Sequence, residues 1–169
     1  MTPCIPDKLK AFEMNRKYMI LWFILLILMS ACSESVSSNE RVKWHSYDAG
    51  MRQSEAEGKN VLISFYADWC TFCEKMEKET FKEPAIAKFL NENFISIKVD
   101  TEKEAEVARK YFVRGLPMTW FLEPGGEKIS SLPGYIPPEM FLQILKYIHS
   151  GSYEEMTFKE YVTELEKSE

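Results

Sequence analysis

The chain has 169 residues, of which 46% are hydrophobic and 14% aromatic, and its formal net charge at pH 7 is −5. This length is sufficient for one domain with a substantial apolar core. The acidic balance argues against nucleic acid as a partner, because binding to phosphates draws on an excess of Lys and Arg.

Residues 1–31 are predicted to form a signal peptide. Arg16 and Lys17 precede an uncharged run over residues 18–29. This run has the length of a signal peptide's apolar region and is shorter than the roughly 20 residues that a membrane-spanning helix needs. Polar residues 1–13 are unusual in front of such a sequence, which points to Met14 as an alternative start of translation.

Cys32 is predicted to carry a lipid. Ser30 and Ala31 stand directly before it, and small residues in front of a cysteine resemble the bacterial lipobox, in which that cysteine becomes the lipidated first residue. An uncleaved membrane anchor is the alternative. Both interpretations place the rest of the chain outside the cytoplasm, attached to a membrane. Ser33 gives no inner-membrane retention signal of the Asp type, so the outer membrane is favoured where there is one. Residues 32–42 would be the lipidated cysteine and a flexible tether.

Elements of a single domain are predicted over residues 43–150. Apolar runs and breakers predict, in chain order, a strand at 42–47, a helix at 49–57, a strand at 61–67, helices at 70–82 and 85–91 separated by Pro84, a strand at 94–99, a helix at 102–112, strands at 118–122 and 128–131, and a helix at 138–149. This order indicates an α/β fold with a central mixed sheet and helices on both faces. The aromatic residues of two of these runs are predicted to lie in the core: Tyr111, Phe112, Trp120 and Phe121.

A C-terminal helical extension is predicted over residues 151–169. Thr157 and Glu160 have the spacing of a capping box. The apolar stripe that follows has helical spacing and is formed by Phe158, Tyr161, Val162 and Leu165. We expect this stripe to pack on its own domain, with docking to a partner as the alternative.

The motif Trp69-Cys70-Thr71-Phe72-Cys73 directly follows the apolar run 61–67. A strand that ends here and turns into a helix places Cys70 at a helix N-terminus, where unpaired N–H groups and the helix dipole favour a thiolate. Translation from Met14 removes Cys4, and lipid occupies Cys32, so Cys70 and Cys73 are the remaining cysteines. A disulfide between Cys70 and Cys73 would close a very short loop and would stabilise the fold little, because it constrains little of the unfolded chain. The pair is therefore expected to have a chemical role.

No metal or other cofactor is expected at this motif. Zinc needs about four ligands, and the mature chain offers only His45 and His149 besides the two cysteines.

Without residues 1–31 the chain has 17 Lys and Arg against 24 Asp and Glu, a net charge of about −7.

The order of elements, the W-C-x-x-C motif and a later Gly-Leu-Pro together resemble the thioredoxin fold, and in particular the C-terminal periplasmic domain of the electron transporter DsbD and related exported thioredoxin-like lipoproteins. The resemblance covers residues 61–148. The residues that carry it are Tyr66-Ala67-Asp68-Trp69-Cys70, Cys73, Glu77, Thr80-Phe81, Pro84, Val99-Asp100 and Gly115-Leu116-Pro117.

The resemblance implies a mechanism in which Cys70 attacks a substrate disulfide and Cys73 resolves the mixed disulfide. Pro117 matches the family's cis-proline, which leaves the backbone of Leu116 free to pair with substrate; an ordinary trans proline is the alternative. Trp69 would cover the dithiol as an apolar lid, or simply pack at the end of the strand.

The sequence departs from thioredoxin at Ser64, which stands where thioredoxin has a buried Asp that takes the proton of the resolving cysteine. Glu77 lies four residues after Cys73, on the same face of the helix, and matches an acid of the DsbD-type domain. We hypothesise that Glu77 modulates proton transfer at Cys73; an exposed helix-surface glutamate is the alternative.

The expected function is a membrane-tethered, exported thiol-disulfide oxidoreductase that reduces disulfides of extracytoplasmic proteins in the periplasm. Strongly oxidising relatives have a histidine between the cysteines, where its positive charge stabilises the reduced form. This chain has Thr71-Phe72 there, which favours the reductase direction. A membrane electron donor of DsbD type would reduce the Cys70–Cys73 disulfide again. The alternatives are an oxidase or isomerase, and a chaperone or binding module without redox function. A monomer is expected, because no dimerisation segment is visible.

Overall fold

The computed structural model describes residues 40–168. Five strands form one sheet in the order β1-β3-β2-β4-β5. Strands β1, β3 and β2 run parallel, whereas β4 is antiparallel to β2 and β5 is antiparallel to β4. The strands are β1 (Trp44–His45), β2 (Asn60–Tyr66), β3 (Phe94–Asp100), β4 (Met118–Leu122) and β5 (Lys128–Pro133). The predicted mixed α/β sheet is confirmed.

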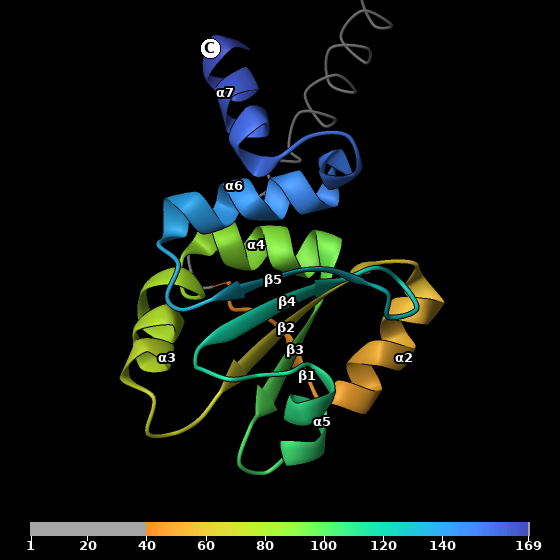
Figure 1. Ribbon diagram of the computed structural model, residues 1–169, viewed down its shortest axis with the longest axis vertical. Coiled ribbons are helices and arrows are strands. Elements are labelled where there is room, and N and C mark those ends of the chain that lie inside the picture. Colours follow the sequence, from red (N-terminus) through yellow and green to blue (C-terminus); the bar gives the residue numbers. More distant parts are fainter. Residues whose placement is uncertain (1–39, 169) are drawn as a thin grey trace, which may run out of the picture. The chain divides into compact units, whose positions relative to one another are not determined.

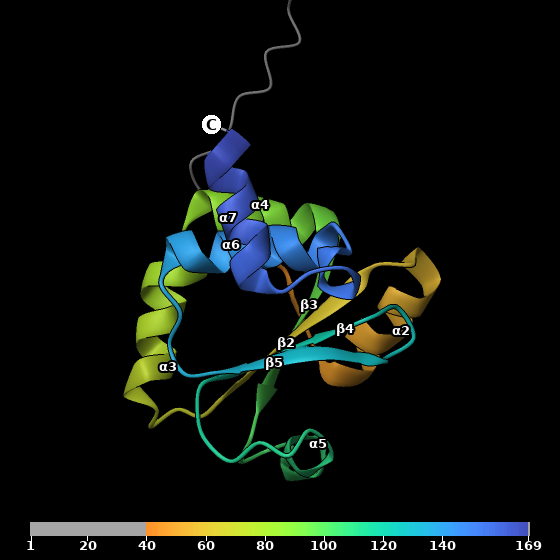
Figure 2. The same ribbon diagram turned by 45° about the horizontal axis from the view of Figure 1, so that its top comes forward.

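Helices cover both faces of the sheet. Figures 1 and 2 show α4 and α6 on one face and α2 and α5 on the other. The α-helices are α2 (Tyr47–Glu57), α3 (Thr71–Lys75), α4 (Pro84–Asn93), α5 (Ala105–Lys110), α6 (Pro138–His149) and α7 (Phe158–Ser168). A 3-10 turn (Ser152–Glu154) joins α6 to the C-terminal segment.

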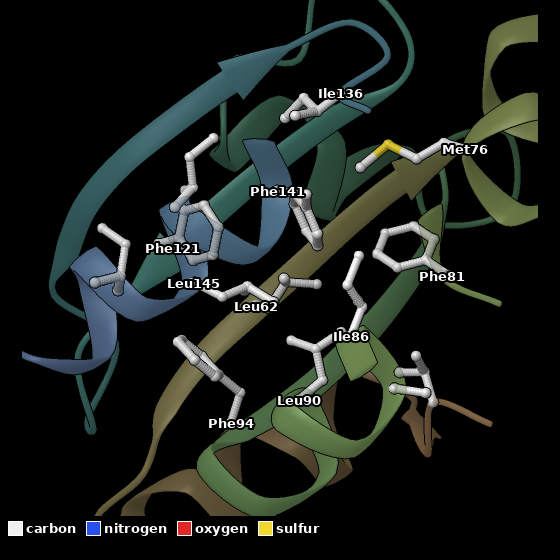
Figure 3. Packing of buried hydrophobic residues seen from close by; sticks show 14 residues of the cluster. Leu62, Met76, Phe81, Ile86, Leu90, Phe94, Phe121, Ile136, Phe141 and Leu145 are labelled. Carbon is white, nitrogen blue, oxygen red and sulfur yellow. The ribbon is translucent and has the colours of Figure 1, made fainter. Parts of the chain in front are cut away.

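The larger core lies between the sheet and the pair α4 and α6. Apolar side chains of the strands meet those of both helices there, as Figure 3 shows for Leu62, Phe121, Leu90, Phe141 and Leu145. These five side chains are fully buried. Each such side chain stabilises the fold by roughly 1.5–3 kcal/mol relative to an exposed one.

The second core lies on the opposite face, where α2 and α5 cover β2 and β3. Ile63, Phe65 and Ile97 are buried there together with Tyr111. Helix α2 comes so close to β3 that a Cβ atom on Gly50 would lie 2.4 Å from Cγ1 of Ile97. The contact therefore requires glycine, since an added methyl group would overpack this core.

The helix that follows the dithiol is shorter than predicted. The sequence predicts a helix over 70–82, but α3 ends at Lys75 and a π-helical turn (Met76–Thr80) follows. The backbone N–H of Phe81 donates to the carbonyl of Met76 at 3.0 Å, which closes the wider turn. Pro84 then begins α4 at its first position, so the predicted restart of the helix is confirmed.

The helix predicted over 102–112 is also shorter, because α5 covers only Ala105–Lys110. The side chain of Asp100 accepts hydrogen bonds from the backbone N–H groups of Glu102 at 3.0 Å and Lys103 at 3.4 Å. These bonds hold residues 101–103 in a turn after β3, an alternative to helix that Asp offers readily.

The prediction that Phe112 lies in the core is wrong. Its side chain is 71% exposed, and its backbone has a φ of 53°, in the left-handed region. The adjacent Tyr111 and the strand residue Phe121 are buried as predicted, and Trp120 is half-buried. Phe112 ends the turn after α5, so its ring lies at the surface, where Nζ of Lys128 is 5.3 Å from the ring centroid.

The C-terminal extension packs on α6. The predicted capping box is present: Oε2 of Glu160 accepts hydrogen bonds from the backbone N–H of Thr157 at 2.8 Å and from its hydroxyl at 2.7 Å. The rings of Phe158 and Tyr161 lie 5.5 and 5.3 Å from the ring of Tyr147, measured between centroids. The hydroxyl of Tyr147 also donates to the carbonyl of Met156 at 2.5 Å.

The predicted signal peptide (residues 1–31), Cys32 with its lipid, and most of the tether lie outside the described residues. Between residues 40 and 168, no helix is long and apolar enough to cross a bilayer. The same part of the chain contains no cluster of three or more His, Cys, Asp and Glu side chains that would suit a metal ion.

Candidate redox site

The two cysteines of the motif lie where β2 gives way to α3. Cys70 is the residue before the first turn of α3, and a disulfide joins it to Cys73. The backbone N–H of Cys73 lies 3.1 Å from Sγ of Cys70 and donates to it. A sulfur atom at this position faces the N–H groups of a first helical turn, which stabilises a thiolate once the disulfide is reduced. Cys70 and Cys73 are 6% and 9% exposed.

A cis peptide bond joins Leu116 to Pro117 directly before β4, as the family resemblance implies. Pro117 lines a pocket of about 270 Å³ together with Cys70 and Cys73. Its carbonyl accepts a hydrogen bond from the N–H of Gly134 at 2.8 Å, which ties it to the end of β5. In the part of the chain that the structure describes, the N–H and C=O groups of Leu116 have no hydrogen-bond partner.

Trp69 lies beside the dithiol with its ring in solvent. The side chain is 69% exposed, and its Nε1–H donates to Oε1 of Glu102 at 3.1 Å. Trp69 does not line the pocket that holds the cysteines; it lines a neighbouring groove with Leu116. A role of Trp69 as an apolar lid stays a prediction.

An ion pair lies in the wall of the dithiol pocket. Oε2 of Glu77, on the π-helical turn, is 2.6 Å from Nζ of Lys98 on β3, and both side chains are half-buried. The Lys98 ammonium also lies 4.8 Å from the ring centroid of Tyr66 and 5.5 Å from that of Trp44. These rings and the carboxylate hold Lys98 in place, since a cation is attracted to the face of an aromatic ring.

Lys98 is a site residue that the sequence did not reveal. It pairs in register with Ser64 on β2, and Ser64 pairs in turn with Thr119 on β4. All three lie on the face of the sheet that carries the dithiol pocket, which both Ser64 and Lys98 line. Alternation along β3 would have placed Lys98 on this face, but only the strand register shows that it lies beside Ser64.

Two buried hydroxyls lie on the sheet face that carries the pocket. Ser64 is buried, and Oγ1 of the buried Thr119 has no hydrogen-bond partner in the described part of the chain. The carboxylates that line the pocket come from Asp68, Glu74 and Glu77. Glu74 forms an ion pair with Lys78, and this hydrogen bond lowers the pKa of Glu74 below its usual value.

Asp100 fixes the turn that carries the partner of Trp69. Its Oδ2 atom is 2.7 Å from Nζ of Lys103. The hydrogen bond from Lys103, helped by the backbone N–H of Glu102, lowers the pKa of Asp100, although burial opposes this. The same pairing raises the pKa of Lys103. The ionised Asp100 thus organises residues 100–103, next to the exposed indole of Trp69.

Among characterised proteins, one similar sequence is the thiol:disulfide interchange protein DsbD of Photorhabdus laumondii. The two are 26% identical over 132 residues, which is 75% of this chain and 23% of DsbD. The chain therefore spans less than a quarter of the length of that relative.

Solved structures share the fold. A thioredoxin from Thermus thermophilus superposes with a TM-score of 0.59 at 27% identity, covering 63% of this chain and 86% of the thioredoxin. A thioredoxin-fold protein from Helicobacter pylori superposes with a TM-score of 0.56 at 21% identity, covering 80% of this chain and 91% of that protein. The model of the thioredoxin-like domain matches residues 47–149. With its Cys70–Cys73 disulfide at a helix N-terminus and a cis-proline in the same pocket, the chain belongs to the thioredoxin-like domain family.

Proposed function

We propose that this chain is a thiol-disulfide oxidoreductase that works as a reductase. The observation that carries the proposal is the shared pocket of Cys70, Cys73 and the cis-proline Pro117. A protein with this arrangement exchanges disulfides through a thiolate at the helix N-terminus. The similarity to DsbD, a thiol:disulfide interchange protein, supports the same chemistry.

The reaction transfers two electrons and two protons from the dithiol to a substrate disulfide. The Cys70 thiolate attacks one substrate sulfur, which forms a mixed disulfide and releases the other substrate sulfur as a thiolate that takes up a proton. Cys73 then loses its proton and attacks Sγ of Cys70. This step releases the second substrate thiol and closes the Cys70–Cys73 disulfide.

Glu77 and Lys98 are the groups we assign to the proton of Cys73. Ser64 is a poor base near neutral pH, whereas Glu77 lines the same pocket as Cys73 and supplies a carboxylate there. Its ion pair with Lys98 keeps that carboxylate beside the pocket. Glu77 accordingly modulates proton transfer, and Lys98 positions it.

The residues between the cysteines support the proposed direction of electron flow. Thr71 and Phe72 add no positive charge there. A positive charge there would stabilise the Cys70 thiolate and so the reduced form. Without it, we expect a low reduction potential, nearer the roughly −270 mV of thioredoxin than the roughly −120 mV of DsbA.

The test is the equilibrium reduction potential of the purified full-length chain, titrated against dithiothreitol and glutathione. We expect a value near −250 mV, on the thioredoxin side of the range. A value above about −150 mV would instead identify an oxidase. Replacement of Cys70 and Cys73 by Ala is the control: it abolishes disulfide exchange, while a chaperone whose dithiol is incidental would keep its activity.

The place of action that we propose is the periplasm, at a membrane. The similarity to DsbD supports a periplasmic domain, and the residues before Cys32 support export and lipidation of that cysteine. The partners would be disulfide-containing exported proteins and a membrane electron donor of DsbD type. Metabolic labelling with a fatty-acid analogue tests the anchor: label should enter the parent chain, and Cys32→Ser should remove it.

A further inference from the structure

A second groove adjoins the dithiol pocket. It has a volume of about 350 Å³ and is lined by Trp69 and Leu116, the direct chain neighbours of Cys70 and Pro117, which line the dithiol pocket. The adjacency leaves room for a protein segment whose sulfur reaches Cys70 to extend along this groove.

The wall of the groove offers unpaired main chain. The N–H and C=O groups of Leu116 have no hydrogen-bond partner within residues 40–168. Ala105 and Ala108 of α5 line the groove with short side chains. An extended segment can pair with such main chain as an added strand does, and short side chains leave room for its own.

Two arginines line the same groove. Arg114 is exposed and has no ion-pair partner among residues 40–168. Arg109 has only a 3.8 Å contact with Glu106, whose side chain is 94% exposed. Both cations are therefore available to an anionic ligand, although the chain as a whole has a net charge of −5.

One acidic side chain beside the groove is already engaged. Glu102 accepts the indole N–H of Trp69 at 3.1 Å, on the Trp69 side of the groove. Asp100, before it in the chain, pairs with Lys103 at 2.7 Å. The charged side chains that line the groove are those of Arg109 and Arg114, and their planar guanidinium groups suit a carboxylate.

We propose that this groove selects client proteins whose reactive cysteine is flanked by Asp or Glu, with the client carboxylate bound by Arg114 and Arg109. The proposal rests on the proposed function and names its substrate class. The chemistry at sulfur is unchanged; the arginines increase the rate at which acidic segments associate and dock. The expected effect is ~3–10-fold in kcat/KM, because exposed ion pairs contribute modestly.

The experiment uses the reduced full-length chain and three peptide disulfides that are identical except at the two residues beside the cysteine, which are Glu, Gln or Lys. Exchange rates are measured at low and at high salt. We expect the Glu peptide to react ~3–10-fold faster than the Lys peptide at low salt, and the ratio to approach one at high salt because exposed charges are screened.

Variants locate the effect. Arg114→Gln and Arg109→Gln together should reduce the Glu to Lys ratio, and Arg114→Lys should restore part of it. The matched control is Arg52→Gln, which changes the net charge equally at an exposed position of α2 outside the groove and should keep the ratio. The salt series tests the proposal even if a variant fails to fold.

Equal rates for the three peptides, or a ratio that survives loss of both arginines or falls equally in Arg52→Gln, overturn the proposed selectivity while leaving the oxidoreductase function intact. No exchange with any peptide overturns the proposed function and the selectivity with it.

Discussion

At the scale of single residues, Phe112 combines two unfavourable features. Its ring is exposed, and its backbone is in a left-handed conformation that Asn adopts more readily than a bulky residue. The left-handed conformation costs roughly 1–2 kcal/mol for an ordinary residue. A contact of the ring with Lys128 offsets part of this cost, since an exposed cation–π pair contributes about 0.5–1 kcal/mol.

We therefore predict that Phe112→Asn gives a more stable chain than Phe112→Leu. Both variants lose the aromatic ring and its contact with Lys128, but only Asn relieves the backbone. The free energy of unfolding, measured in urea, should be higher for Asn than for Leu by about 1 kcal/mol. Equal stability of the two variants would mean that the backbone at this position carries no cost.

A second prediction concerns the carboxylate in the dithiol pocket. Glu77→Gln keeps the size of the side chain but removes the base and weakens the ion pair with Lys98. If Glu77 takes part in proton transfer at Cys73, the exchange rate should fall by about tenfold or more and its pH profile should shift.

Glu74→Gln is the matched control for Glu77→Gln. Glu74 also lines the pocket, but its carboxylate is paired with Lys78 at the exposed surface of the helix. This variant should keep both the rate and the pH profile. Identical profiles for the parent and Glu77→Gln would remove Glu77 from the mechanism.

Residues of the site differ in how far the sequence reveals them. Cys70, Cys73 and Pro117 belong to short motifs that can be recognised in the sequence. The family resemblance implied that these motifs lie together, and the structure places all three residues in one pocket. Lys98 is brought to the pocket by strand register, which depends on the whole sheet. Phe112 could not be placed from its apolar character, because its position depends on how α5 ends.

At the scale of elements, the turn between β3 and α5 depends on one ionised side chain. Lys103 and the backbone N–H of Glu102 stabilise the Asp100 carboxylate and lower its pKa. The folded chain therefore binds a proton at Asp100 more weakly than the unfolded chain does. The stability that Asp100 contributes is complete above the unfolded pKa of about 3.9, and it is lost as the pH falls through the lower folded value.

The third prediction follows from this sign. At pH 7, Asp100→Asn should lower the free energy of unfolding, and the difference from the parent should shrink as the pH falls below about 4. Lys103→Met, which removes the main cause of the lowered pKa, should reduce the same pH dependence. Urea unfolding at a series of pH values measures both. A difference that is constant with pH would show that ionised Asp100 does not hold the turn.

The lengths of α3 and α5 depend on local hydrogen bonds that compete with the α-helical ones. The sequence located the α-helices of residues 40–168 correctly, because the apolar spacing that buries residues such as Phe141 and Leu145 is strong. Two of the predicted helix boundaries were wrong because another hydrogen bond competes with the α-helix there. One such place is the Asp100 turn before α5, and the other is the π-helical turn after α3. Neither bond has a signature as strong as proline, which correctly marked the start of α4 at Pro84.

At the scale of the whole molecule, the fold was predictable because order, periodicity and turn residues agree. Alternating strands and helices led to a mixed sheet covered on both faces, and the structure has this arrangement (Figures 1 and 2). The groove beside the dithiol was not predictable in the same way. It is formed by the segments around Trp69, Arg109 and Leu116, which come together only in the folded chain.

The last prediction connects global stability to the direction of electron flow. A thermodynamic cycle joins folding to oxidation of the dithiol. The unfolding free energy of the oxidised chain minus that of the reduced chain therefore equals nF times the reduction potential of the unfolded dithiol minus that of the folded dithiol, where n is the number of electrons and F is the Faraday constant. For this two-electron couple, about 30 mV corresponds to about 1.4 kcal/mol. A folded dithiol that is more reducing than the unfolded one thus makes the oxidised chain the more stable form.

If the chain is a reductase, the oxidised form should unfold at a higher urea concentration than the reduced form. In an oxidase the order is reversed, because a strong oxidant has a stabilised reduced form. Urea unfolding with and without excess dithiothreitol measures the order. A chain with Cys70 and Cys73 replaced by Ala serves as the control, since dithiothreitol should not change its transition. A reduced form more stable than the oxidised one would contradict the reductase assignment independently of any titration of the potential.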